Sequence, residues 1–571
     1  MSGVTRGQGK EAVRLCEHIV RQAFGNVVCR VASVLLNRGR LPILILSRLS
    51  ALTRKSTAAS LLILMQHNLV QTTSLTLLPD PPQGMSSSDD QYEFDVSECL
   101  HRLRYGRVLA LTAGWPTFGK LASTAEEIVR MVMLYGKVKV RDLRGSLAGD
   151  GDAIRASAVQ EAMLLLVRWR FLIPTCPELQ ILEAEIIQRR YNHLKTQTQR
   201  NSGAKVLSAN QINEARLSAR NQVLNERDAL QALEKVLTRR EKINKKRKKG
   251  EDEYDYDLKP DVSLRINHDR YGILIRDELI VKAAEDRWNV GAGIVMRAVC
   301  SAAVNEHSTL SEARTGTDVM FNEIIARIPH EAYPVLGPGI IGGTSKSTAD
   351  IVRAYLAILA GEDQMLANGS AFLSKTSSTN PAYKIELERV CVKIREALLS
   401  ELVRQRVGEK AGRVLAVVTK AKIASEQTVR DCAMLPLKDA RIHLARLQKL
   451  NLVETTEVPK SGAKMRINMP SAAEYHLWSV DLPRVYNSLL SNIYKTIGNT
   501  IQRRAAEVEK RTTLLEREAK AVRLGGRALL QTKDQNDLGS LEESVKKLVT
   551  GQERSDLVAF ILRDLPGWPA K

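Results

Sequence analysis

The pattern of apolar and polar positions repeats at two distant places in the chain. A leucine-rich stretch with helical spacing ends at Asn68 and is followed by residues 69–73, which read LVQTT; a second ends at Asn451 and is followed by residues 452–456, which read LVETT. The spacing predicts a helix that buries one face. Asparagine favours a helix end because it tolerates the left-handed conformation, and the β-branched run favours a strand. We interpret this phrase as the third helix, tight turn and first wing strand of a winged helix.

The residues before and after Asn68 complete such a unit. Helical patterns cover residues 11–24, 26–37 and 41–52, and the third helix begins near Ser56 and Thr57, which are good N-cap residues. A polar loop at 79–90 then leads into residues 92–96, which alternate as a return strand should. We expect this loop to be the wing.

Similar patterns recur further along the chain. A looser copy of the phrase occupies residues 163–175, and the third helix of the fourth unit covers 436–450, followed by strands at 451–458 and 475–480. We predict four third helices, which end near Asn68, Trp169, Ala360 and Asn451.

Two regions depart from this pattern. Residues 183–249 are highly polar and end in a basic run, which an acidic run at 251–257 follows directly. Opposite charge blocks without apolar residues cannot form a core, so we expect partial disorder there. The tail from residue 483 is amphipathic, and its apolar stripe includes Ile493, Ile497 and Ile501. A stripe of this kind predicts a coiled coil or helical hairpin, and we expect it to be a docking or packing element.

The resulting fold class is mainly α with small β wings: four tandem, extended winged-helix domains plus a C-terminal coiled coil or helical hairpin. The expected boundaries are 1–104 and 105–180 for the first two winged helices, 181–261 for the charged insertion, 262–387 and 388–482 for the other two winged helices, and 483–571 for the coiled coil.

The composition of the chain limits the kinds of molecule that it is expected to bind. The formal net charge is +21, which indicates a polyanionic neighbour, most often nucleic acid. Aromatic residues make up 4% of the chain, too few for a protein that stacks single-stranded bases on aromatic rings. The first 20 residues lack the apolar run of a signal peptide, and no stretch has about 18 consecutive apolar residues. We expect a soluble intracellular protein with no membrane partner.

Motifs for catalysis or cofactor binding are not found. The seven cysteines lack the spacing of a zinc site, and their odd number argues against a disulfide framework. The glycine-rich stretch at 337–347 has Thr, Ser and Lys where a phosphate-binding loop needs Gly, Lys and Ser or Thr. We therefore expect no enzyme activity in this chain, no cofactor and no metal.

Two groups of basic residues are candidate sites. The basic run contains Lys245, Lys246, Arg247, Lys248 and Lys249. It is interpreted as a nuclear import signal, with nucleic-acid contact or a solubilising linker as alternatives. Exposed basic positions near or on the third helices could face DNA or a protein partner, and a merely solvated surface is the alternative. They are Arg54, Lys55, Lys438, Arg441, Arg446 and Lys449.

The first unit also resembles a known family. Residues 11–73, centred on RVASVLLNRGRL at 30–41, resemble the N-terminal helix-turn-helix region of the largest subunit of the RNA polymerase III-specific heterotrimer. The layout of four winged helices, a charged insertion after the second and a C-terminal coiled coil is similar over essentially the whole chain. The family is also similar to the large subunit of the factor that helps polymerase II open promoters.

The resemblance implies a role without an active site. Members of the family are non-catalytic nuclear subunits that contact the polymerase clamp and two smaller partners, with promoter DNA nearby. They support initiation and DNA opening for transfer RNA, 5S ribosomal RNA and other small transcripts. Two alternatives stay open: a scaffold of the proteasome-lid or signalosome type, and a free DNA-binding regulator. The first is disfavoured because a winged unit occupies the first 70 or so residues here.

Overall fold

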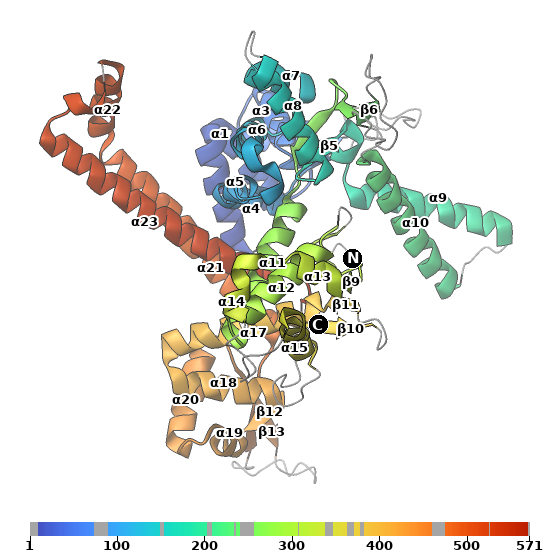
Figure 1. Ribbon diagram of the computed structural model, residues 1–571, viewed down its shortest axis with the longest axis vertical. Coiled ribbons are helices and arrows are strands. Elements are labelled where there is room, and N and C mark those ends of the chain that lie inside the picture. Colours follow the sequence, from blue (N-terminus) through green and yellow to red (C-terminus); the bar gives the residue numbers. More distant parts are fainter. Residues whose placement is uncertain are drawn as a thin grey trace. The chain divides into compact units, whose positions relative to one another are not determined.

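The computed structural model of the chain shows many helices and short strands (Figure 1). The residues that it describes are 9–73, 90–148, 153–202, 208–232, 236–239, 256–305, 308–336, 347–361, 371–376, 382–459, 474–524 and 526–568. Within these ranges the strands form four three-stranded sheets and one two-stranded sheet. The predicted fold class, mainly α with small β wings, is confirmed.

The chain divides into two compact bodies, which we describe separately. The N-terminal body contains residues 10–271 and 501–541, and the C-terminal body contains residues 272–500 and 542–571. The first two winged units belong to the N-terminal body, and the third and fourth belong to the C-terminal body.

The first winged unit follows the predicted order. Its first helix breaks at Gly25, where φ is +83°, so that it consists of the two helical segments that the sequence predicts. Strand β3 lies between β1 and β2, with Tyr92 opposite Leu41 and Phe94 opposite Val70. The elements are α1 (Lys10–Arg38), β1 (Leu41–Pro42), α2 (Ile43–Ser50), α3 (Arg54–Gln66), β2 (Val70–Thr72) and β3 (Gln91–Phe94), followed by α4 (Val96–His101).

The second winged unit closes later than the sequence predicts. Its return strand is β8, which lies between β4 and β5 and pairs Leu264 with Val138 and Ile266 with Leu172. The polar insertion is therefore part of the wing of this unit, so we place the end of the unit after residue 266 instead of at 180. The elements are α5 (Tyr105–Ala113), α6 (Ala122–Tyr135), β4 (Val138–Lys139), α7 (Val140–Ala148), α8 (Ala153–Arg168), β5 (Leu172–Thr175) and β8 (Ser263–Ile266).

The insertion contains ordered helices that the sequence did not predict. Helices α9 (Glu183–Ser202) and α10 (Ala209–Leu230) pack as a hairpin, and β6 (Leu237–Arg239) pairs with β7 (Tyr256–Leu258). Ser208 caps α10 in a capping box with Gln211. Widely spaced apolar residues, among them Tyr191 and Ala219, pack the two helices together, and such a pattern is weak in the sequence. The basic and acidic runs at 240–255 lie outside the described residues.

The third winged unit is built around helix α12. Val295, Leu356 and Phe372 belong to its buried core, and β11 lies between β10 and β9. The elements are α11 (His268–Arg287), α12 (Val290–Ala303), β9 (Val319–Met320), α13 (Phe321–Ala326), α14 (Tyr333–Leu336), α15 (Thr348–Ala360), β10 (Leu373–Lys375) and β11 (Ala382–Ile385).

The fourth winged unit has the longest wing strands. Strand β14 lies between β12 and β13, and Trp478 is opposite both Ala424 and Thr455. The elements are α17 (Leu387–Val407), α18 (Glu409–Ala421), β12 (Ile423–Ser425), α19 (Glu426–Ala433), α20 (Leu437–Lys449), β13 (Glu454–Pro459) and β14 (Glu474–Ser479).

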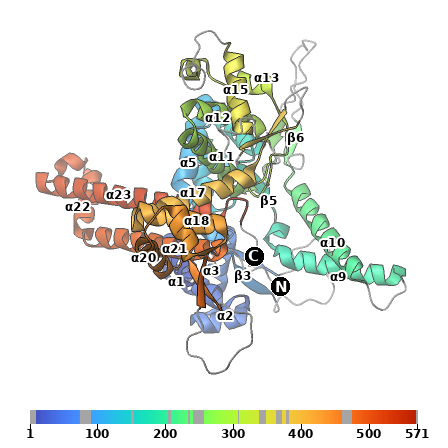
Figure 2. The same cartoon turned by 90° about the horizontal axis from the view of Figure 1, so that it is seen from below.

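The tail is helical, as predicted. It contains α21 (Leu482–Glu509), α22 (Thr512–Leu524) and α23 (Thr532–Arg563). In the N-terminal body, the side chain of Gln502 on α21 lies 2.7 Å from His18 of α1, and the guanidinium of Arg504 donates to Gln22 at 3.2 Å. Figure 2 shows α21 and α23 side by side along much of their length.

The third helices share one way of ending. Each is followed within two residues by a residue with positive φ: Asn68 at 59°, Arg170 at 56°, Gly361 at 74° and Asn451 at 57°. In three units the next amide then bonds back to the helix, for example Leu69 N to Leu64 O at 2.9 Å and Leu452 N to Leu447 O at 3.1 Å. This is the left-handed helix cap that the asparagines predict, and the predicted ends of the third helices are confirmed to within two residues.

Helix α1 is the one helix among the described residues that is long and apolar enough to cross a membrane, judged by length and composition. The helix contains Arg21 and Arg30, so it is not an uninterrupted run of about 18 apolar residues. In addition, Gly25 interrupts the helix, and Leu15, Val31 and Leu35 are buried in the first winged unit. Its apolar residues therefore form the core of that unit.

Candidate interaction surfaces

Helix α3 presents both basic and apolar side chains. The Thr53 hydroxyl accepts from the Ser56 amide at 3.2 Å and caps the helix, so Arg54 and Lys55 fall in its first turn, where they are exposed. The positive end of the helix dipole lies at this turn, so it does not stabilise the charges of Arg54 and Lys55. Further along, Leu62 is 67% exposed and is followed by Ile63, which is also exposed. This helix offers an apolar surface with basic residues at its start.

Helix α20 presents a basic face. Lys438, Arg446 and Lys449 are exposed, and none of them forms an ion pair with another described residue. Arg441 is also exposed, but its guanidinium pairs with Glu426 at 2.8 Å. Ala440, Leu444 and Leu447 are buried and anchor the other side of the helix. Of the four predicted basic residues, three are therefore unpaired cations on one face.

The two helices can be compared position by position when Asn68 and Asn451 are aligned. Lys55 then corresponds to Lys438, but Leu62, Ile63 and Gln66 take the places of Ala445, Arg446 and Lys449. The outer face of the third helix is thus mainly apolar in the first unit and basic in the fourth. Apolar faces suit protein contacts, and unpaired basic residues suit phosphates.

The other two third helices offer fewer basic side chains. Arg353 is exposed on α15 but pairs with Asp350 at 2.8 Å, while Tyr355 and Leu356 are buried. On α8, the exposed Arg155 pairs with Glu127 at 3.3 Å. Among the described residues, α20 therefore has the strongest positive face of the third helices.

A polar joint links the first two winged units, and sequence reasoning missed it. The ammonium of Lys137 donates to the carbonyl oxygen of Met65 at 2.9 Å and to the side chain of Gln180. The amide of Gln66 donates to the carbonyl oxygens of Tyr135 at 3.2 Å and Lys137 at 2.5 Å. Burial, with nearby Arg265, lowers the pKa of Lys137 to about 8. The only local signal in the sequence is a lysine after Tyr135-Gly136, which does not identify its partners.

The side chain of His67 lies at the same joint. Burial, together with the charges of Arg102 and Lys137, lowers the pKa of His67 to about 4. Its Nδ1 lies 3.4 Å from Nη1 of Arg102, and its ring lies 4.7 Å from that of Phe24. The imidazole is therefore neutral at physiological pH.

The apolar stripe of the tail is covered by the chain itself. Ile497 is 0% exposed and Ile501 is buried, while Ile493 is half-buried. The interpretation of this stripe as a surface open to a partner is wrong for Ile497 and Ile501, because their side chains already pack within the chain. The packing alternative for the stripe fits these burials.

Two predicted features lie outside the described residues. They are the import run, Lys245 to Lys249, and the glycine-rich stretch at 337–346.

The described residues contain no group of three or more His, Cys, Asp or Glu side chains that could hold a metal ion. All seven cysteines are free, and Cys432 is exposed. Burial is the main cause that raises the pKa of Cys391, to about 12, so this thiol stays protonated.

Three parts of the chain match known domains. Residues 14–73 match the RNA polymerase III subunit RPC82 helix-turn-helix domain, and residues 162–335 match RNA polymerase III subunit RPC82. Residues 399–480 match the C-terminal winged-helix domain of POLR3C. The chain belongs to the RNA polymerase III subunit RPC82 family. The match to the RPC82 helix-turn-helix domain includes α3, and the match to the POLR3C winged-helix domain includes α20.

Full-length relatives agree with this family. The chain is 24% identical to human DNA-directed RNA polymerase III subunit RPC3 over 570 residues, which cover 95% of this chain and 92% of the human protein. It is 23% identical to the protein of the same name from Danio rerio, with 97% of each chain covered. A fungal relative, subunit rpc3 of Botryotinia fuckeliana, is 21% identical and also covers 97% of this chain.

Proposed function

We propose that this chain is a non-catalytic subunit of DNA-directed RNA polymerase III. The observation that carries the proposal is the agreement of three separate RPC82-family domains with relatives named RPC3 that cover nearly the whole chain. The surfaces described above support it, because they suit protein and nucleic-acid contacts.

The role that we propose is support of promoter-directed initiation and DNA opening for small transcripts such as transfer RNA and 5S ribosomal RNA. The partners are other RNA polymerase III subunits, including two smaller subunits of a heterotrimer and the clamp of the largest subunit. Promoter DNA lies nearby. The place of action is the nucleus, with import through the run from Lys245 to Lys249.

The winged units divide these contacts between them. In our proposal, the basic face of α20 contacts DNA, because Lys438, Arg446 and Lys449 are exposed and unpaired among the described residues. The apolar outer face of α3, with Leu62 and Ile63, contacts a protein subunit.

Affinity purification tests the proposal. The tagged full chain is purified from nuclear extract, and the co-purifying proteins are identified and assayed for transcription of a transfer RNA gene. We expect the subunits of RNA polymerase III and promoter-dependent activity, with no nucleotide polymerisation by the isolated chain. Recovery of proteasome-lid or signalosome proteins, or of the chain by itself, would contradict the proposal.

A further inference from the structure

The turn between α19 and α20 holds an apolar side chain in solvent. Met434 has φ of 53° and ψ of 50°, and its amide caps α19 by donating to the carbonyl oxygen of Arg430. The next residue, Leu435, is buried, and its amide donates to the same carbonyl oxygen at 3.1 Å. The backbone around Met434 is therefore fixed, while its side chain is 86% exposed.

The turn itself does not require a methionine. When Asn68 and Asn451 are aligned, Met434 corresponds to Ala51, which has the same φ of 53° in the first winged unit. A positive φ is uncommon for residues other than glycine, and a bulky side chain does not favour it. Since alanine is enough for the turn, the methionine adds a long apolar side chain that packs little within the chain. That side chain is available to a partner of the fourth winged unit.

The charges around Met434 favour a polyanion as that partner. Lys438, Arg446 and Lys449 are exposed and unpaired among the described residues. In contrast, each acidic residue of α19 and α20 is in an ion pair: Glu426 with Arg441 at 2.8 Å, Asp431 with Arg430 at 2.7 Å, and Asp439 with Lys410 at 3.2 Å. The charge left over on these two helices is therefore positive, which suits the phosphates of DNA.

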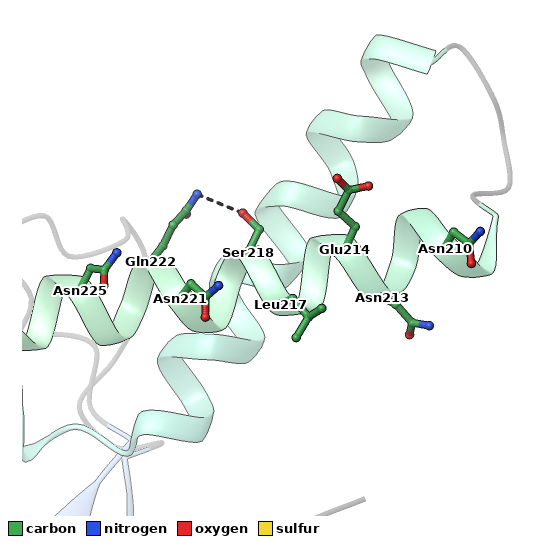
Figure 3. Close-up of a pocket in the computed structure, with 8 residues that line it drawn as sticks. All are labelled: Asn210, Asn213, Glu214, Leu217, Ser218, Asn221, Gln222 and Asn225. Carbon is green, nitrogen blue, oxygen red and sulfur yellow. Dashed lines mark hydrogen bonds between the residues drawn. The ribbon is translucent and has the colours of Figure 1, made fainter. Parts of the chain in front are cut away.

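Exposure of an apolar side chain would not identify a partner by itself, as α10 shows. Its Leu217 is 62% exposed, and the residues that line the shallow groove beside it are uncharged apart from Glu214 (Figure 3). Amide and hydroxyl groups both donate and accept hydrogen bonds, so they suit many partners. Met434 differs because a helix with a row of unpaired cations follows it directly.

The place of Met434 in the unit indicates which part of the DNA it contacts. A recognition helix lies in the major groove with its N-terminal residues at the base edges. Met434 comes four residues before Lys438, just outside the amino end of α20. In the major groove, thymine presents a C5-methyl group, which apolar side chains contact.

We propose that Met434 contacts the C5-methyl group of a thymine in the major groove of promoter DNA. The inference rests on the proposed function, in which the basic face of α20 contacts DNA. Lys438, Arg446 and Lys449 bind phosphates, which carry no sequence information, whereas Met434 adds a preference for one base. 5-Methylcytosine has the same methyl group and fits the contact, but cytosine and uracil lack it.

Photocrosslinking first locates the DNA. A photoreactive amino acid replaces Cys432, an exposed neighbour of Met434, in the full tagged chain of purified polymerase bound to promoter DNA. We expect an adduct to DNA, and its position gives the base pairs beside the turn. An adduct to protein alone, or no adduct, would overturn the DNA role proposed for α20, and the inference with it.

Removal of the methyl group then tests the inference. Promoters with deoxyuridine in place of each thymine near the adduct are compared with the natural promoter. We expect one of these substitutions to weaken binding about fourfold, which corresponds to the loss of one buried methyl group. At the same place, 5-methylcytosine should bind more tightly than cytosine by a similar factor.

Variants of Met434 show whether this side chain makes the contact. Met434→Ala should bind the thymine and deoxyuridine promoters equally, whereas Met434→Leu should keep most of the difference because its side chain is also apolar. The matched control is Met320→Ala, which removes a 44% exposed methionine from β9 and should leave the difference intact.

The two levels of the proposal can fail separately. If no deoxyuridine weakens binding, or if Met434→Ala keeps the difference, the inference is wrong even when position 432 crosslinks to DNA. Loss of the difference in Met320→Ala as well would also overturn it. In each of these cases the DNA role of α20 would stand, and its contact would be limited to phosphates.

Discussion

Arg395 donates a hydrogen bond of 2.9 Å to the carbonyl oxygen of Gly567. The same guanidinium donates to the carbonyl oxygens of Pro566 at 2.8 Å, Ile561 at 2.9 Å and Leu565. Arg395 lies on α17 and is 1% exposed. Arg395 therefore caps the carboxyl end of α23. Helix carbonyls lack partners at this end, and a positive charge is favourable there.

Replacing this arginine should destabilise the C-terminal body. Arg395→Met would leave several buried carbonyls without donors, and we expect a loss of about 3 kcal/mol in the free energy of unfolding. Thermal and urea unfolding of the full chain measure it. The matched control is Arg404→Met on the same helix, whose partner Glu401 is exposed; it should change little. Equal effects of the two substitutions would contradict this role.

The first and fourth winged units could be predicted well from sequence because their signals are local. The Asn68 and Asn451 phrases combine a helix period, a left-handed cap and a β-branched run within a few residues. Each signal acts over one or two turns of chain, so no distant partner is needed to recognise it. The basic face of α20 could be predicted for the same reason, since helix spacing places Lys438 and Lys449 together.

The missed features depend on partners far away in the sequence. Strand β8 completes a wing with β5, almost a hundred residues earlier, and a four-residue strand gives little signal by itself. Lys137 and Arg395 bind backbone carbonyls, which leave no mark in the sequence. The burial of Ile497 could not be predicted for a similar reason, because an apolar stripe in the sequence does not show which part of the chain or which partner packs on it.

Acid should weaken the joint between the first two winged units. The pKa of His67 is lowered to about 4 from 6.5, so the unfolded chain binds this proton more tightly. The contribution to stability is therefore present above pH 6.5 and is lost as the pH falls from 6.5 towards 4, at a cost of about 2 kcal/mol by pH 5. Thermal unfolding at pH 7.5 and 5 should show a smaller difference for His67→Gln than for the natural chain. Identical pH dependence in both proteins would rule out His67 as the cause.

Charges in the tail stripe should disrupt folding before they affect assembly. Ile497 and Ile501 are buried in the chain, so Ile497→Asp with Ile501→Asp would place unpaired carboxylates in apolar surroundings. We expect a loss of several kcal/mol and rapid proteolysis of the tail. Asn499→Asp adds a charge at an exposed position of the same helix and should be tolerated. A double variant that is as stable as this control would show that the stripe is not a packing surface.

The basic run should direct nuclear import. Replacing Lys245, Lys246, Arg247, Lys248 and Lys249 with serine removes the charge of the run from the chain, and we expect nuclear accumulation of a fluorescent fusion to fall. Thermal unfolding should be unchanged, since the run has no apolar side chains to place in a core. Assembly with partners could carry the variant into the nucleus, so the fusion is measured above the level of the other polymerase subunits. Unchanged accumulation under these conditions would remove the import role.

The basic face of α20 should add salt-dependent affinity for DNA. Each phosphate contact contributes about 0.9 to the slope of log affinity against log salt concentration. Replacing Lys438, Arg446 and Lys449 with alanine should lower this slope by about 2 to 3 in polymerase bound to promoter DNA, with a similar loss on unrelated sequences, because phosphate contacts carry no sequence information.

A control with the same change in net charge separates local contact from overall attraction. It replaces Arg353, Arg389 and Lys393, which pair with carboxylates on their own helices or beside them. This variant should keep nearly the full slope, since long-range attraction is screened within about 10 Å at 0.1 M salt. If both triple variants lose the same slope, the chain attracts DNA through its total charge, and α20 is not its contact surface. If neither triple variant lowers the slope, α20 faces a protein or solvent. The proposed division of roles, with α20 on DNA and α3 on protein, would then be wrong.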